Sequence, residues 1–104
     1  MMIKKKICNL SQLEGKNYFI SWVKELKDEI IVFRKNGKIH VKSSVCPHFG
    51  GHIIYDKKQE CLYCYWHGLK FSTNGGKCLN DKNFKVCLNS YRHKIKDNNI
   101  YIEK

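Results

Sequence analysis

The sequence predicts a small all-β domain that carries a site on its loops. Short apolar runs alternate with turn residues in both halves of the 104-residue chain, and little of it has helical periodicity. The Asn36-Gly37 pair between two such runs is a strong hairpin signal. Between the hairpin regions, residues 45–77 hold the only proline and most of the glycines. Loops held by rigid hairpins are where binding sites are commonly built.

The expected elements follow one another without a linker or an internal repeat. A single helical turn with Ser11 as its cap is expected near the start, because serine favours this position. Asp97-Asn98 is expected to turn a second hairpin near the end. In order along the chain, the predicted elements are the helical turn at 10–16 and strands at 17–24, 29–35, 38–44, 90–96 and 99–104. A chain of this length supports one core and therefore one domain.

The charge is strongly positive, with 20 basic against 9 acidic residues and a formal net charge of +11. Most basic residues are scattered lysines, which indicates either a solvated lysine-rich surface or electrostatic steering toward an acidic protein partner. No nucleic-acid partner is expected, because no nucleic-acid-binding motif accompanies the charge. No membrane association is expected either, since no apolar run approaches the length of a membrane span.

The cysteines are expected to be ligands or free thiols. The first residues, MMIKKKICNLSQL, carry the charges of a signal peptide but lack its apolar segment, so the sequence predicts a cytoplasmic protein. Thiols remain reduced in that compartment. A disulfide framework of the six cysteines is therefore less favoured than a metal site.

Two closely spaced pairs of residues form the candidate metal site. VCPHFGGH supplies Cys46 and His48, and CLYCYWHG supplies Cys64 and His67, with fifteen residues between the pairs. Each pair can reach one metal from a single tight loop. A zinc ion would accept two thiolates and two imidazoles, as in a structural or nucleic-acid-binding module. A redox dithiol of Cys61 and Cys64 would leave the first pair unexplained.

The C-x-H, C-x-x-H arrangement resembles the Rieske motif, and C-P-H-F-G-G and C-Y-W-H-G-L-K-F are similar to its ferredoxin and oxygenase branch. The resemblance implies one Rieske-type 2Fe–2S cluster, with Cys46 and Cys64 on one iron and His48 and His67 on the other. Cys61 is then not a ligand. The implied fold is a Rieske-type antiparallel β-sandwich over residues 1–104, with a loop-built cluster-binding part at 45–77. The basal β part would comprise 1–44 and 78–104.

Four positions distinguish the branches of this family. Respiratory-type Rieske proteins have a cysteine in each cluster loop, joined as a disulfide, where this chain has Gly51 and Trp66. They also have serine and tyrosine hydroxyls that donate to sulfur, where this chain has Leu69 and Phe71. Without such donors the reduced, more negative cluster is less stabilised. The resemblance therefore implies a midpoint potential near the low end of the Rieske range, roughly −150 mV.

The resemblance implies a monomeric one-electron carrier that is itself no catalyst. It would pass electrons from a flavin-dependent reductase to a terminal oxygenase, a hydroxylase or another redox protein. Lys57, Lys58 and Lys70 are expected near the cluster loops, where they would meet the acidic docking surface of a partner. An alternative is a separately encoded or expressed N-terminal electron-input domain of a larger Rieske oxygenase. The zinc-bound module is the second alternative.

Overall fold

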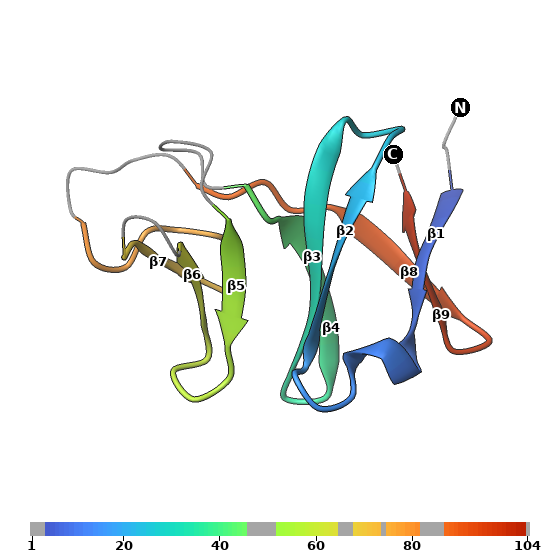
Figure 1. The fold of residues 1–104 in the computed structure, drawn as a ribbon, viewed down its shortest axis with the longest axis horizontal. Helices are drawn as coiled ribbons and strands as arrows, with labels where there is room; N and C mark the ends of the chain where they lie inside the picture. The colour runs from blue at the N-terminus through green and yellow to red at the C-terminus, as the bar shows by residue number, and fades with distance from the viewer. Residues whose placement is uncertain (1–3, 46–51, 65–67, 74, 82–86, 104) are drawn as a thin grey trace.

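The computed structural model describes residues 4–45, 52–64, 68–73, 75–81 and 87–103. In these ranges nine strands form three antiparallel sheets of three strands each, which stand side by side in Figure 1. The predicted all-β class is confirmed. No helix within the same ranges is long and apolar enough to cross a membrane.

The middle sheet has the order β2-β3-β4 and is built from two consecutive hairpins. Its strands are β2 (Tyr18–Val23), β3 (Asp28–Lys35) and β4 (Lys38–Ser43). Asn36 and Gly37, which join β3 to β4, have φ angles of 52° and 76°. Two residues at positive φ make the turn that matches the twist of a hairpin. The hairpin predicted at Asn36-Gly37 is therefore confirmed.

A second sheet joins the two ends of the chain in the order β1-β9-β8. Its strands are β1 (Lys4–Asn9), β8 (Arg92–Lys96) and β9 (Asn99–Glu103). Asp97 and Asn98 both have positive φ, as the second predicted hairpin requires. The sequence did not predict β1, because its lysines show no alternation of apolar and polar residues. Lysine-rich strands are typical of sheet edges, and β1 is an edge strand.

The third sheet, of order β5-β6-β7, lies within the insert that was expected to be rich in loops. Its strands are β5 (Ile53–Asp56), β6 (Cys61–Cys64) and β7 (Lys70–Ser72). They are three or four residues long, too short for periodicity to identify from sequence. The loops of this insert thus extend from a short sheet of their own, whose individual strands the sequence did not predict.

Two hydrophobic cores lie on opposite faces of the middle sheet. Ile30 and Val32 of β3 belong to the core shared with the β1-β9-β8 sheet. Ile31 and Phe33 belong to the core shared with the β5-β6-β7 sheet. Successive residues of a strand point to opposite faces, so four consecutive apolar residues can all be fully buried. Strand β3 therefore joins the β5-β6-β7 sheet to the rest of the fold.

The predicted helical turn is a 3-10 helix, Leu10–Leu13, whose cap is Asn9 and not Ser11. The Ser11 backbone N–H donates to Asn9 Oδ1 over 2.9 Å, and the Asn9 N–H donates to Gln12 Oε1 over 2.8 Å. This reciprocal pair is a capping box. Leu13 at the end of the turn is fully buried in the same core as Ile30.

Candidate metal centre

The first ligand loop leaves and returns to the fold at a narrow neck. Val45, just beyond β4, and His52, just before β5, form an antiparallel bridge. The Ile53 N–H donates to the Ser44 carbonyl over 2.8 Å and closes the neck behind that bridge. Residues 46–51, which include the predicted ligands Cys46 and His48, lie outside the described residues. Their two attachment points to the fold are nevertheless fixed beside each other.

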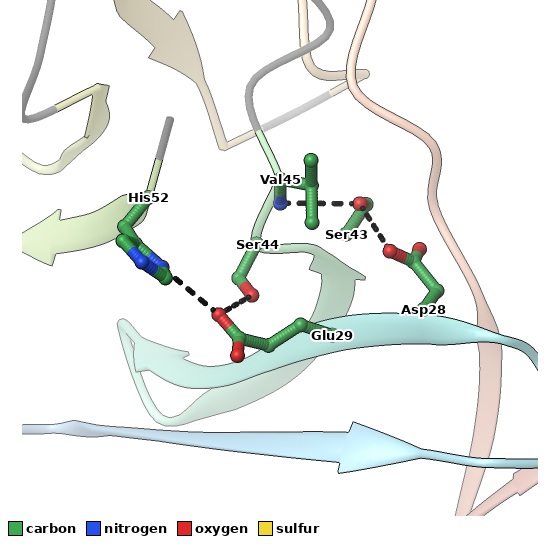
Figure 2. Close-up of polar contacts among 6 residues, drawn as sticks. All are labelled: Asp28, Glu29, Ser43, Ser44, Val45 and His52. Atoms are coloured by element: carbon green, nitrogen blue, oxygen red, sulfur yellow. Dashed lines mark hydrogen bonds and ion pairs between the residues drawn. The ribbon is translucent and has the colours of Figure 1, made fainter. Parts of the chain in front are cut away.

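Side chains from the start of β3 brace both sides of this neck (Figure 2). Ser43 Oγ donates to Asp28 Oδ1 over 3.2 Å and accepts the Val45 N–H over 3.3 Å. The phenol of Tyr91 donates to the other carboxylate oxygen of Asp28 over 2.5 Å. Burial and this hydrogen bond both raise the pKa of Tyr91, so the phenol stays protonated. The last residue before the first ligand pair is thereby tied to β3.

The second ligand loop begins at Cys64, whose side chain is fully buried at the end of β6. The Cys64 N–H donates to the Leu69 carbonyl, and the Gly68 N–H donates to the Cys64 carbonyl over 3.0 Å. Gly68 has a φ of 68°, the left-handed conformation that glycine adopts without strain. Residues 65–67, which include the predicted ligand His67, lie outside the described residues. These two hydrogen bonds join the described residues on either side of them.

Both ligand loops leave the same end of one hairpin. Ile53, the first residue of β5, pairs directly with Cys64, the last residue of β6. The Asp56–Cys61 pair closes the opposite end of these antiparallel strands. The loop that ends at His52 and the loop that begins after Cys64 therefore start from adjacent backbone positions. Of the four predicted ligands, the structure places Cys64 itself and the attachment points of the loops that carry the other three.

Asn80 braces the second loop, a role that nothing in the sequence indicates. Its Oδ1 accepts the Lys70 N–H over 2.9 Å, and its Nδ2 donates to the Gly68 carbonyl over 2.8 Å. The Cys78 thiol lies 3.8 Å from the same Oδ1. One amide thus holds both the end of the ligand loop and the first residue of β7. Asparagine followed by aspartate in a turn region is too common a pattern to indicate such a brace.

The arrangement of Cys61 and Cys64 excludes a dithiol. They are the two ends of the extended strand β6, so they point to opposite faces and their Cα atoms are about 10 Å apart. A disulfide requires less than about 7 Å. Burial, followed by the charge of Asp56, raises the pKa of the Cys61 thiol, which favours an inert structural cysteine.

The remaining described cysteines, Cys8, Cys78 and Cys87, sit in strand-like or turn segments of the sequence, which predicts that they are small buried residues. The prediction is confirmed for Cys8 and Cys78, which are buried in the two cores. Burial raises the pKa of Cys8 to about 11. The prediction is wrong for Cys87, which is exposed just before Leu88. Cys87 therefore belongs to neither core.

The environment of the Cys64 thiol is apolar. Leu69 and Phe71 belong to the same buried core as Cys64, and Phe71 is fully buried opposite Leu62. These are the two positions where hydroxyl donors were expected to be missing. Apolar packing also keeps water from the buried end of β6, and low polarity disfavours added negative charge at a metal centre.

The lysines expected near the loops lie elsewhere. Lys57 and Lys58 are in the turn between β5 and β6, at the end of the sheet opposite Ile53 and Cys64. The Lys70 backbone is next to the second loop, but its Nζ donates to Gln59 Oε1 in that distant turn over 2.6 Å. The structure therefore corrects the expectation that these three ammonium groups surround the ligand loops.

The paired loops, with two thiolates and two imidazoles in the sequence they carry, fit a mixed sulfur–nitrogen cluster. Comparison with known families decides the assignment, because residues 4–92 match the Rieske [2Fe-2S] domain. The chain belongs to the Rieske family. Its cofactor is accordingly one Rieske-type 2Fe–2S cluster, and its general role is that of a Rieske-domain electron carrier.

Curated and structural relatives agree with this assignment. The chain is 36% identical over 63 residues to cholesterol 7-desaturase from Ciona intestinalis, matching 58% of this chain and 13% of the relative. Across its curated relatives the chain spans 12 to 40% of their length. The ferredoxin of carbazole 1,9a-dioxygenase from Nocardioides aromaticivorans IC177 has a TM-score of 0.78 at 17% identity, with 95% of each chain covered.

A second structural relative comes from a different enzyme system. The putative NADH-dependent nitrite reductase small subunit from Mycobacterium tuberculosis has a TM-score of 0.73 at 16% identity. The similarity covers 100% of this Rieske chain and 96% of that protein. At such identities the two structures establish a shared fold, and they show that Rieske folds of this size occur in more than one redox system.

Proposed function

We propose that this Rieske chain is a ferredoxin-type one-electron carrier whose cluster is bound by Cys46, His48, Cys64 and His67. The observation that carries the proposal is the direct pairing of Ile53 with Cys64. This pairing sets the described residues that border the two segments with the proposed ligands at one end of the β5-β6-β7 sheet, which supports a site shared by both segments. Residues 45–77 would then be the cluster-binding part, with 1–44 and 78–104 as its support.

The chain's own residues would shape the chemistry in three ways. When bound, the cluster supplies one reversible electron transfer between its oxidised and reduced states. The apolar packing of Leu69 and Phe71 leaves the sulfurs without hydroxyl donors at those positions and holds the potential low. The braces at Asn80 and at the neck keep both loops in place, so little reorganisation accompanies the change in charge. The imidazoles would couple the potential to pH at alkaline values.

A flavin-dependent reductase is the proposed electron donor, and a terminal oxygenase or hydroxylase is the proposed acceptor. The similarity to the ferredoxin of a carbazole dioxygenase supports this pair, and the carrier's net charge of +11 suits a partner with an acidic docking surface. The similarity to a nitrite reductase small subunit supports a reductase system as a second candidate acceptor. The curated relatives are much longer than this chain, since the match covers only 13% of the Ciona protein. This difference in length supports the alternative that the chain is an electron-input domain of a larger oxygenase.

Ligand substitution tests the assignment directly. Cys46→Ser and Cys64→Ser should each abolish the red-brown colour and the reduced-state electron paramagnetic resonance (EPR) signal, since each removes a thiolate ligand. Cys61→Ser is the matched control, because it changes a cysteine of the same strand that faces the other way. Iron and zinc contents are measured on each protein. Loss of the cluster in Cys61→Ser with its retention in Cys64→Ser, or zinc in place of iron in the unaltered protein, would refute the proposal.

A further inference from the structure

The neck of the first ligand loop contains a polar contact that the family assignment does not explain. Glu29 lies at the start of β3 and pairs there with Trp22 of β2, so its backbone is fixed in the middle sheet. Its Oε1 accepts a hydrogen bond from Ser44 Oγ over 3.1 Å and lies 3.2 Å from His52 Nδ1 (Figure 2). Ser44 precedes the loop and His52 follows it. A single carboxylate oxygen therefore binds both sides of the neck.

The contact is reinforced by the backbone. The Ser44 N–H donates to the Glu29 carbonyl over 2.8 Å, and Ser44 is fully buried. An ionised carboxylate only accepts hydrogen bonds, so the proton shared with His52 lies on Nδ1. The Glu29 side chain is 27% exposed, against 66% for His52. The carboxylate is therefore the sheltered partner of this pair, and its charge is less screened by water than that of a surface residue.

The position of this charge matters because reduction adds one negative charge at the cluster. Ser44 is two residues before the proposed ligand Cys46, and His52 is four residues after the proposed ligand His48. A carboxylate fixed at that neck disfavours the reduced state electrostatically. Its hydrogen bonds also restrict the two backbone segments from which the loop extends.

We propose that Glu29 is a positioning residue for the first ligand loop and that its charge lowers the midpoint potential. The inference rests on the proposed assignment of Cys46 and His48 as ligands. It combines two effects of one side chain, which different substitutions separate. Glu29→Gln removes the charge and keeps an oxygen that accepts from Ser44 Oγ and from His52 Nδ1. Glu29→Ala removes both the charge and the acceptor.

Glu60→Gln is the matched control. Glu60 is in the turn between β5 and β6, at the opposite end of the sheet from the ligand loops, and its carboxylate lies 4.0 Å from Lys35 Nζ. This substitution makes the same change in net charge at a greater distance from the neck. A general effect of net charge would therefore shift the potential equally in Glu29→Gln and Glu60→Gln.

The holoproteins are compared by voltammetry, by the EPR spectrum of the reduced state and by the rate of cluster loss to an iron chelator. Glu29→Gln should raise the midpoint potential above that of Glu60→Gln while retaining the cluster. Glu29→Ala should also broaden the EPR signal and speed cluster loss at least about tenfold, the effect of losing even one of the two charge-assisted hydrogen bonds to Ser44 and His52.

Two results would overturn the inference. One is a potential in Glu29→Gln that equals that of Glu60→Gln, and the other is unchanged cluster loss in Glu29→Ala. If Glu29→Ala does not fold, the comparison between the two glutamine variants still decides the effect of charge. Absence of iron from the unaltered protein would instead refute the proposed ligands, so the two failures are distinguishable.

Discussion

Replacement of Gly76 by alanine should destabilise the protein strongly, because this glycine touches the backbone of a distant segment. An alanine Cβ would lie 2.7 Å from the Leu88 carbonyl oxygen and 2.9 Å from its backbone nitrogen. Gly76 also has a φ of 71°, and its carbonyl accepts the Leu88 N–H over 2.9 Å. Leu88 is buried in the same core as Cys64 and Phe71. The contact thus joins the segment that follows β7 to the segment that leads to β8.

The size of the effect follows from three contributions. The left-handed conformation costs a residue with a side chain about 1–2 kcal/mol. Relief of the overlap requires movement of backbone atoms, for which overpacking in cores suggests about 1–3 kcal/mol. Weakening of the Leu88 hydrogen bond adds about 1 kcal/mol. The expected loss in the free energy of unfolding for Gly76→Ala is therefore about 3–6 kcal/mol, a large part of the stability of a typical domain.

Gly75→Ala is the control, because Gly75 also has a positive φ, of 99°, but an added Cβ would meet nothing within 4 Å. It should lose only the conformational contribution, about 1–2 kcal/mol. Urea unfolding of both holoproteins, followed by far-ultraviolet circular dichroism and by bleaching of the cluster, measures the difference. Equal losses in the two variants would show that the approach of Gly76 to Leu88 does not constrain the fold.

Two further predictions concern the potential and the pH dependence of stability. Leu69→Ser and Phe71→Tyr should each raise the midpoint potential, because each adds a hydroxyl in the core that holds Cys64. The double variant should raise the potential further. An unchanged potential in the double variant would show that neither hydroxyl reaches a sulfur. Burial, aided by the charge of neighbouring lysines, lowers the pKa of His40, so the unfolded chain binds its proton more readily than the fold does. Stability should accordingly be greatest above the usual histidine pKa and fall as the pH drops below it. His40→Gln should reduce the fall in the free energy of unfolding between pH 7.5 and 5, as measured by urea unfolding. An identical dependence on pH in the two proteins would show that His40 does not cause the fall.

Local sequence determined the features that depend on a few neighbouring residues. The hairpins at Asn36-Gly37 and Asp97-Asn98 were predictable because these residues tolerate the positive φ that tight hairpins need. The family could likewise be identified from sequence, since ligand spacing is a property of short segments. The buried run from Ile30 to Phe33 indicated a strand, although its burial on both faces required a third sheet that was not predicted.

Tertiary structure decided how distant segments meet. Strands β5, β6 and β7 are too short to have a recognisable pattern, and they are stabilised by pairing with one another and by packing on β3. Nothing near Glu29 in the sequence indicates that its carboxylate reaches His52, 23 residues away. The same holds for Asn80 beside Gly68 and for Gly76 against Leu88. Backbone preferences act over a few residues, whereas these contacts form only when the sheets pack, and packing is therefore what places the supports of the ligand loops.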